Sequence, residues 1–144
     1  MSDLHFSIEQ SIVWGDMDAF NHINNTIYFR YFENVRIAYF EETGVNQMMA
    51  RTKVGPILGE TSCRYLKPLT YPDTIKVSTY TSVLRPKRFT MKYSIESNRL
   101  SSVVAEGSGE IVFLDYNTGK TTLIPESIRE SIIALDQHSL VIIN

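Results

Sequence analysis

Two carboxylates, an imidazole and a group of amide side chains are concentrated in one short stretch near the N-terminus of this chain. Asp16, Asp18, His22, Asn24 and Asn25 are followed directly by a long apolar pattern with helical spacing. Asparagine accepts hydrogen bonds from the free amides that open a helix, and these amides carry the positive end of the helix dipole. A carboxylate beside them could activate water or attack a carbonyl, while the amides stabilise negative charge on oxygen. The stretch is therefore suited to chemistry at a carbonyl group.

Each of these acidic and imidazole side chains also has a structural interpretation. Asp18 could be an ordinary turn residue that accepts backbone hydrogen bonds. We expect Asp16 to be structural, because a second ionised carboxylate nearby would raise the pKa of Asp18 and weaken it as a base. His22 could position the loop, act as a second catalytic group or bind a metal, and we favour the first role. The spacing D-x-D-x-x-x-H is too loose to define a metal site, so we expect none.

The elements that must position this stretch follow from the spacing of the apolar residues. The stretch from Phe6 to Trp14 alternates as a half-buried strand does. Beyond Tyr28, aromatic residues at helical spacing predict a helix that is buried on most sides and ends near Gly44, a plausible C-terminal cap. Within that helix, Glu33 and Arg36 are spaced for a surface ion pair.

The remainder of the chain is expected to be mostly strand. A mixed run covers residues 57–66, and alternating runs cover about residues 75–83, 89–95 and 103–113. A short closing helix should follow Pro125, and the apolar tail "LVIIN" should either finish the core or serve an interface. This order predicts one α+β domain over residues 1–144, in which an antiparallel sheet of about five strands wraps around the long central helix.

Composition excludes several classes of partner and location. The net charge is −2 and the sequence pI is about 5.9, so we expect neither a nucleic acid partner nor a membrane surface. No apolar run approaches the roughly 18 residues that a membrane span requires. The lone Cys63 cannot form an internal disulfide, and the N-terminus lacks the layout of a signal peptide, so we expect a cytoplasmic protein. We expect Cys63 to be a small packing residue rather than a nucleophile.

Two segments resemble the 4-hydroxybenzoyl-CoA thioesterase-like family of hotdog-fold acyl-CoA thioesterases. They are "WGDMDAFNHINNTIYFRYFENVR" and "CRYLKPLTYPDTIKV", and the resemblance covers essentially the whole chain. It implies a hotdog fold and a homodimer or homotetramer whose subunits pair into a continuous sheet, with active sites at the dimer interface. It further implies that Asp18 is the catalytic carboxylate and that backbone amides near Asn24 and Asn25, with His22 beside them, bind the thioester carbonyl. Phe20 departs from the asparagine that related plant thioesterases use at this position, which disfavours an asparagine-assisted mechanism.

The activity that the resemblance implies is hydrolysis of an acyl-CoA thioester by Asp18, acting as general base or as nucleophile. Coenzyme A is then part of the substrate, and no separate cofactor is expected. Its phosphates need cations near the entrance, for which Arg85, Lys87 and Arg88 are candidates. The alternatives are a hotdog protein that binds acyl-CoA without turnover, and a hotdog enoyl-thioester hydratase or dehydratase that uses Asp18 with His22.

Overall fold

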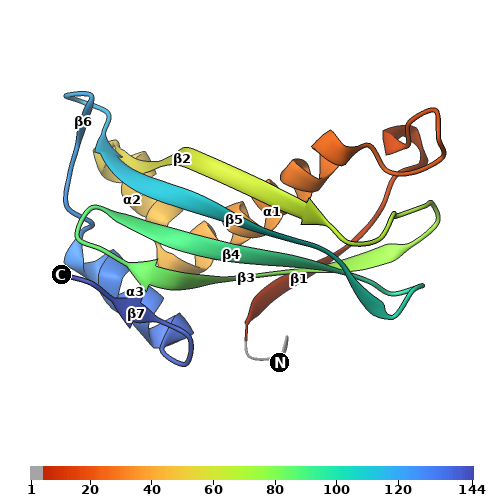
Figure 1. The fold of residues 1–144 in the computed structure, drawn as a ribbon. Coiled ribbons are helices and arrows are strands. Elements are labelled where there is room, and N and C mark those ends of the chain that lie inside the picture. Colours follow the sequence, from red (N-terminus) through yellow and green to blue (C-terminus); the bar gives the residue numbers. More distant parts are fainter. Residues whose placement is uncertain (1–4) are drawn as a thin grey trace.

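The strands form a single curled sheet, in which the five long strands are antiparallel. The computed structural model describes residues 5–144. Five long strands follow the order β1-β3-β4-β5-β2 across the sheet (Figure 1). They are β1 (Phe6–Ser11), β2 (Val54–Tyr65), β3 (Thr74–Leu84), β4 (Arg88–Ser97) and β5 (Ser102–Asp115). The expected α+β hotdog arrangement, with a sheet of about five strands around a long helix, is thereby confirmed.

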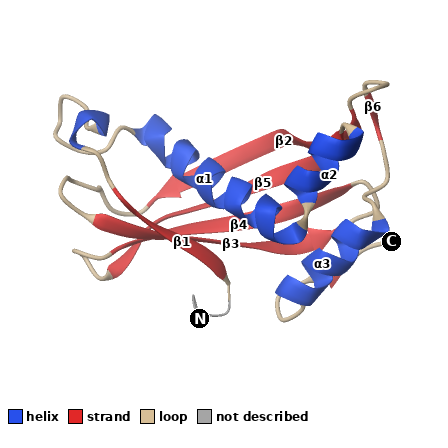
Figure 2. Ribbon diagram, turned by 180° about the vertical axis from the view of Figure 1, so that it is seen from behind, coloured by secondary structure: helices blue, strands red, loops and turns tan. Residues whose placement is uncertain are grey.

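Helix α1 (Asn25–Thr43) crosses one face of this sheet, and two shorter helices lie near its C-terminal end (Figure 2). Gly44 ends α1 in the left-handed conformation, with φ of 87°, and so acts as the expected cap. The same glycine opens α2 (Val45–Thr52), which the sequence analysis missed because the helical pattern was expected to stop there. None of the helices between residues 5 and 144 is long and apolar enough to cross a membrane.

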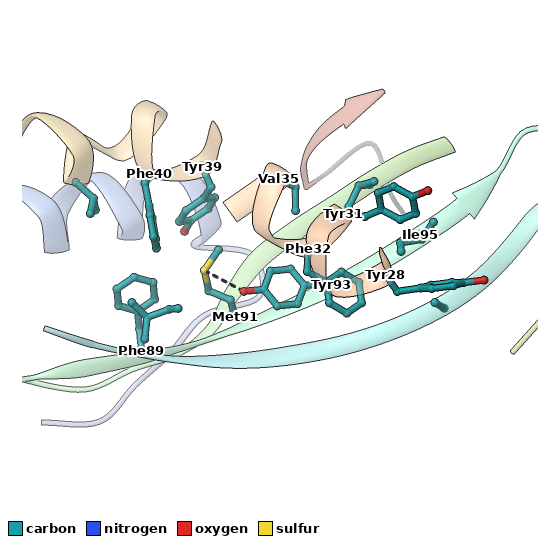
Figure 3. Close-up of a cluster of buried hydrophobic side chains, with 14 of the residues drawn as sticks. Tyr28, Tyr31, Phe32, Val35, Tyr39, Phe40, Phe89, Met91, Tyr93 and Ile95 are labelled. Carbon is teal, nitrogen blue, oxygen red and sulfur yellow. Dashed lines mark hydrogen bonds between the residues drawn. The ribbon is translucent and has the colours of Figure 1, made fainter. Parts of the chain in front are cut away.

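Aromatic side chains of α1 fill the space between the helix and the sheet (Figure 3). Tyr31, Phe32 and Tyr39 are almost fully buried, and fully burying a side chain of this size contributes about 1.5–3 kcal/mol. The ring of Phe32 stacks on Tyr93 of β4 with centroids 4.7 Å apart. A Cβ atom at Gly107 of β5 would collide with the Phe32 ring, so glycine there allows the helix to approach the sheet closely.

The first strand is shorter than expected. β1 ends at Ser11, and a 3-10 turn at Trp14–Asp16 replaces the predicted continuation to Trp14. Ile12 is still buried, but 68% of Trp14 is exposed. The chain must leave the sheet after Ile12 to build the polar loop before α1, and local alternation does not reveal that departure.

The predicted surface pair between Glu33 and Arg36 is wrong. Glu33 pairs instead with Arg30, with 3.4 Å between Arg30 Nε and Glu33 Oε1. Arg36 is buried and its Nη1 donates to the hydroxyl of Tyr93 at 3.1 Å. Both pairs have the same spacing along the helix, so the rotation of α1 against the sheet decides which of them forms.

The C-terminal segment packs at the end of the sheet where α1 finishes. The expected closing helix is α3 (Glu126–Asp136), which follows Pro125. Two short strands accompany it: β6 (Lys120–Thr121) pairs with β5, and β7 (Val141–Ile142) runs parallel to β3. Val141 and Ile142 are 56% and 44% exposed, whereas Leu140 packs against the core, so only the first residue of the apolar tail contributes to it.

A buried carboxylate ties α3 to the sheet and to α1. Asp136 Oδ2 accepts hydrogen bonds from the hydroxyl of Tyr39 and, at 2.8 Å, from the amide of Thr81 on β3. Burial raises the pKa of Asp136 above its ordinary value, although the bonds from Thr81 and Tyr39 and the charge of His5 oppose the shift.

The stability of Asp136→Asn relative to that of the wild type is expected to increase as the pH rises. A carboxyl whose pKa is raised by folding contributes most to stability below its unfolded pKa of about 3.9, and this contribution is lost as the pH rises through the folded pKa. The free energy of unfolding of Asp136→Asn minus that of the wild type should therefore increase between about pH 4 and pH 7. Urea unfolding followed by circular dichroism measures this difference, with Glu126→Gln on the exposed part of α3 as the control. A difference that stays constant or falls would contradict the prediction.

Candidate active site

The loop between β1 and α1 is folded into a compact turn that carries Asp18. Met17 and Ile23 form an antiparallel bridge at the base of this turn. The Asp18 amide donates to the carbonyl of His22 at 2.8 Å, and the Asp18 carbonyl accepts from the amide of Asn21 at 3.0 Å. Asn21 adopts a positive φ of 62°, which asparagine tolerates better than most residues. These backbone bonds fix the position from which the Asp18 side chain extends.

The carboxylate of Asp18 keeps one oxygen free. Its Oδ1 accepts a hydrogen bond from the Phe20 amide at 2.9 Å. Among residues 5–144, Asp18 Oδ2 has no hydrogen-bond partner. Asp18 also has no ion pair there, because the only ion pair among these residues joins Arg30 and Glu33. Asp18 therefore has the local turn bond expected of a structural aspartate and also an oxygen that can contact water or substrate.

The start of α1 leaves one backbone amide without an acceptor. Asn24 caps the helix, because its Oδ1 accepts from the Thr26 amide at 2.9 Å. The Asn24 amide itself donates to the carbonyl of Asp16 at 3.0 Å, and the Ile27 amide donates to the carbonyl of Asn24 at 2.9 Å. In the described part of the chain the Asn25 amide has no such partner. It lies at the positive end of the helix dipole, where a developing negative charge is stabilised.

A cleft of about 330 Å³ brings these groups together. Asp18, His22 and Asn25 all line it, so the structure unites three of the predicted site residues. The remaining walls come from the loop before α1, from α1, from the last residue of β2 and from the segment that follows it. They consist of Ile23, Tyr28, Tyr65, Leu66, Lys67 and Pro68.

The wall formed by the end of β2 and the segment after it was given no catalytic or carbonyl-binding role from the sequence alone. The Tyr65 hydroxyl donates to the carbonyl of Asn25 at 2.9 Å, and the Ile23 amide donates to the carbonyl of Leu69 at 2.8 Å. These bonds join segments that are some forty residues apart in the chain, and the sequence offers no signal for such contacts. Cys63, which precedes this wall on β2, is half-buried, and burial raises the pKa of its thiol, as suits a packing residue.

A larger hollow of about 600 Å³ lies elsewhere on the sheet. Its lining is rich in serine, including Ser62, Ser94 and Ser108, and it contains neither Asp18 nor any residue of α1. It also contains His5 and Glu106, but no helix start whose free amides could bind a developing oxyanion.

The remaining predicted residues are not brought to the cleft within one chain. Asn24 serves as the helix cap and does not line the cleft. Arg85 and Lys87 lie in the turn between β3 and β4, and Arg88 is the first residue of β4, at the end of the sheet opposite the loop that carries Asp18 (Figure 1). Strand β3 separates the two ends by roughly 33 Å. Among residues 5–144, no group of three His, Cys, Asp or Glu side chains could hold a metal ion.

Comparison with known proteins relates this chain to thioesterases by sequence and by structure. The thioesterase-like superfamily matches residues 12–132. The PA2801 protein of Pseudomonas aeruginosa is 31% identical, with 90% of this chain and 98% of that chain covered and a TM-score of 0.80. A thioesterase of Thermus thermophilus, solved with coenzyme A and zinc, is 26% identical, with 91% and 94% covered and a TM-score of 0.79. A chloroplastic acyl-acyl carrier protein thioesterase of Arabidopsis thaliana is 27% identical over 92% of this chain and 70% of that protein.

Proposed function

Because the chain belongs to the thioesterase-like superfamily and is a thioester hydrolase of the hotdog fold, we propose that it hydrolyses an acyl-CoA thioester to the free acid and coenzyme A. The observation that carries this proposal is that Asp18 and Asn25, whose backbone N–H has no acceptor among the described residues, line the same cleft. Coenzyme A bound to the Thermus thermophilus thioesterase supports the choice of carrier.

Two groups of the cleft divide the chemistry between them. The Asn25 amide donates a hydrogen bond to the thioester carbonyl oxygen and stabilises the negative charge that forms there. Asp18 Oδ2 either removes a proton from the attacking water or attacks the carbonyl carbon itself to form an anhydride that water then cleaves. In both routes the carbon–sulfur bond breaks and coenzyme A leaves as its thiolate, which takes up a proton. His22 holds the turn through its carbonyl bond to the Asp18 amide.

Release of free thiol from a panel of aromatic, short and long acyl-CoAs tests this proposal. We expect turnover of at least one class. Binding by calorimetry without thiol release would instead identify an acyl-CoA-binding protein that does no chemistry. Loss of the absorbance of a conjugated enoyl thioester, again without thiol release, would identify a hydratase.

A second copy of the chain should complete the nucleotide side of the site. Among the described residues, β2 pairs only with β5, so one edge of this 12-residue strand is open. Ile57, Leu58 and Tyr65 along the strand are 45%, 39% and 43% exposed. Long open edges favour pairing with another strand, and two copies meet most simply about a two-fold axis. Antiparallel pairing of β2 with its copy would bring the basic turn between β3 and β4 to the same end as the Asp18 cleft of the other subunit.

Replacing Lys87 and Arg88 together by alanine is expected to raise the KM for an acyl-CoA about tenfold with little change in kcat. Lost phosphate contacts weaken ground-state and transition-state binding equally. Initial rates of thiol release against substrate concentration give both constants. The same acyl group on pantetheine, which lacks the nucleotide, should be hydrolysed equally well by variant and wild type.

Arg51→Ala is the control for the basic turn, since Arg51 is an exposed cation on α2. It should leave the KM unchanged. An unchanged KM in the double variant, or an equal increase with the pantetheine substrate, would contradict a role for this turn in binding phosphate.

A further inference from the structure

Arg36 is a buried cation that lacks a carboxylate partner. Only 9% of it is exposed, and its one hydrogen bond, from Nη1, goes to the neutral hydroxyl of Tyr93. The guanidinium carbon lies 6.0 Å from the centroid of the Tyr93 ring. In residues 5–144 the single ion pair is between Arg30 and Glu33. A guanidinium has five N–H donors, and a buried charge without a counter-charge is destabilising, so Arg36 is suited to receive an anion.

A cavity of about 270 Å³ lies beside this guanidinium, between α1, α2 and β2. Arg36 and Asn46 are its polar lining residues, and the rest is apolar, including Phe40, Leu58 and Ile111. The Asn46 amide group is already engaged, because it donates to the carbonyl of Ile37 and to Glu41 Oε1. Arg36 is therefore the one charged residue among those that line this otherwise apolar space.

The unpaired nitrogens of Arg36 keep some accessible surface, and Arg36 lines this cavity. Among residues 5–144 the only fully buried side-chain polar atom without a partner is the hydroxyl of Tyr31. Arg36 Nε and Nη2 have no hydrogen-bond partner in the described structure, so they are not sealed inside the protein. An apolar cavity with one forked cation suits a ligand that has a methylene body and a carboxylate at its end.

The cavity lies far from the Asp18 cleft of its own chain but close to that of a paired subunit. Asn25 and Arg36 are about 17 Å apart along the axis of α1. On β2, however, Leu58 lines the cavity and Tyr65 lines the Asp18 cleft. Antiparallel pairing of β2 about a two-fold near Thr61, the middle of its exposed stretch, places Leu58 beside the Tyr65 region of the partner subunit. The cavity of one subunit then continues the cleft of the other.

We propose that this cavity is the acyl-group pocket and that Arg36 selects acyl groups with a terminal carboxylate. The inference rests on the proposed function, and it narrows the substrate class to ω-carboxyacyl-CoA thioesters. Arg36 determines specificity here and takes no part in the bond-breaking step.

Matched substrate pairs test this selection. Adipoyl-, suberoyl- and sebacoyl-CoA are compared with hexanoyl-, octanoyl- and decanoyl-CoA, which have the same chain lengths and lack the second carboxylate. For the best pair, the wild type should show a kcat/KM at least about tenfold higher with the carboxylated member. Arg36→Met should bring this ratio to about one by losing activity only on the carboxylated substrate. The ratio for Arg36→Lys should lie between those of the wild type and Arg36→Met, because lysine keeps the positive charge but lacks the paired N–H donors of a guanidinium.

Both substrates are measured on the same protein, so a folding defect in Arg36→Met lowers both rates and leaves their ratio unchanged. Arg30→Met, at an exposed position of the same helix, is the control and should leave the ratio unchanged. A wild-type preference for the neutral substrates, or an equal loss on both in Arg36→Met, overturns the inference while the proposed function stands.

Absence of hydrolysis with every substrate overturns the proposed function. The preference of the pocket for a terminal carboxylate is then tested by measuring binding affinities. Calorimetry with suberoyl-CoA and octanoyl-CoA should still show tighter binding of suberoyl-CoA to the wild type and no such preference in Arg36→Met. Equal affinity of the wild type for the two ligands overturns the inference about the pocket.

Discussion

Asp18→Asn is expected to lower the kcat for acyl-CoA hydrolysis by about a hundredfold or more. The substitution preserves the size of the side chain and an oxygen that can accept the Phe20 amide, so the turn should keep its shape. An amide can neither take a proton from water nor attack a carbonyl at a useful rate, which removes both roles open to Asp18. Free-thiol release at saturating substrate measures the loss.

Asp16→Asn is the matched control, because Asp16 lies on the same loop but does not line the cleft. Asp16 supports the helix start through its main-chain carbonyl, which accepts a hydrogen bond from the Asn24 amide. The substitution leaves this carbonyl in place. The control should retain a kcat close to that of the wild type. The assignment of Asp18 fails if Asp18→Asn stays within a few-fold of the wild type, or if Asp16→Asn loses as much.

Asn25→Pro is expected to lower kcat by about a hundredfold or more through the loss of one backbone donor. Proline is favoured at the first position of a helix and lacks an N–H group, so it removes the unpaired donor while keeping the helix. The preceding Asn24 already has φ of −58° and ψ of 138°, a conformation that suits a residue before proline. The kcat for thiol release, measured beside the thermal midpoint of unfolding, separates catalysis from stability.

Asn25→Ala is the control for this backbone experiment. It removes the side chain of Asn25 but retains the N–H group, and we expect it to keep most of the wild-type kcat. Equal losses in the alanine and proline variants would assign the effect to the side chain. A proline variant with wild-type kcat would show that the Asn25 amide does not bind the reacting oxygen.

The sequence predicts the parts of the fold that depend on local periodicity. The central helix and its end at Gly44 follow from aromatic spacing and a terminal glycine, and the long strands follow from alternation. The exposure of Trp14 and Phe20, 68% and 80%, is not predictable in this way because both are apolar residues on a loop. Local pattern records the type of a residue, whereas its exposure depends on where the chain leaves the sheet.

The residues of the candidate site also differ in whether local sequence could predict them. Asp18, His22 and Asn25 are near one another in sequence, so their meeting in one cleft could be expected from the motif. The Tyr65 wall could not, because β2 reaches the helix start only through the sheet order. Arg36 was assigned to the surface because helical spacing permits a pair with Glu33, and only the packing of α1 on the sheet buries it.

A crystal structure of Asp18→Asn with a ketone analogue of an acyl-CoA, in which a methylene group replaces the thioester sulfur, tests directly whether the Asn25 amide binds the reacting oxygen. The ketone oxygen should lie about 3 Å from the Asn25 amide nitrogen, and the carbonyl carbon should lie beside the side chain at position 18. A fully bound analogue whose carbonyl lies away from the start of α1, with the Asn25 amide facing water, would contradict this prediction.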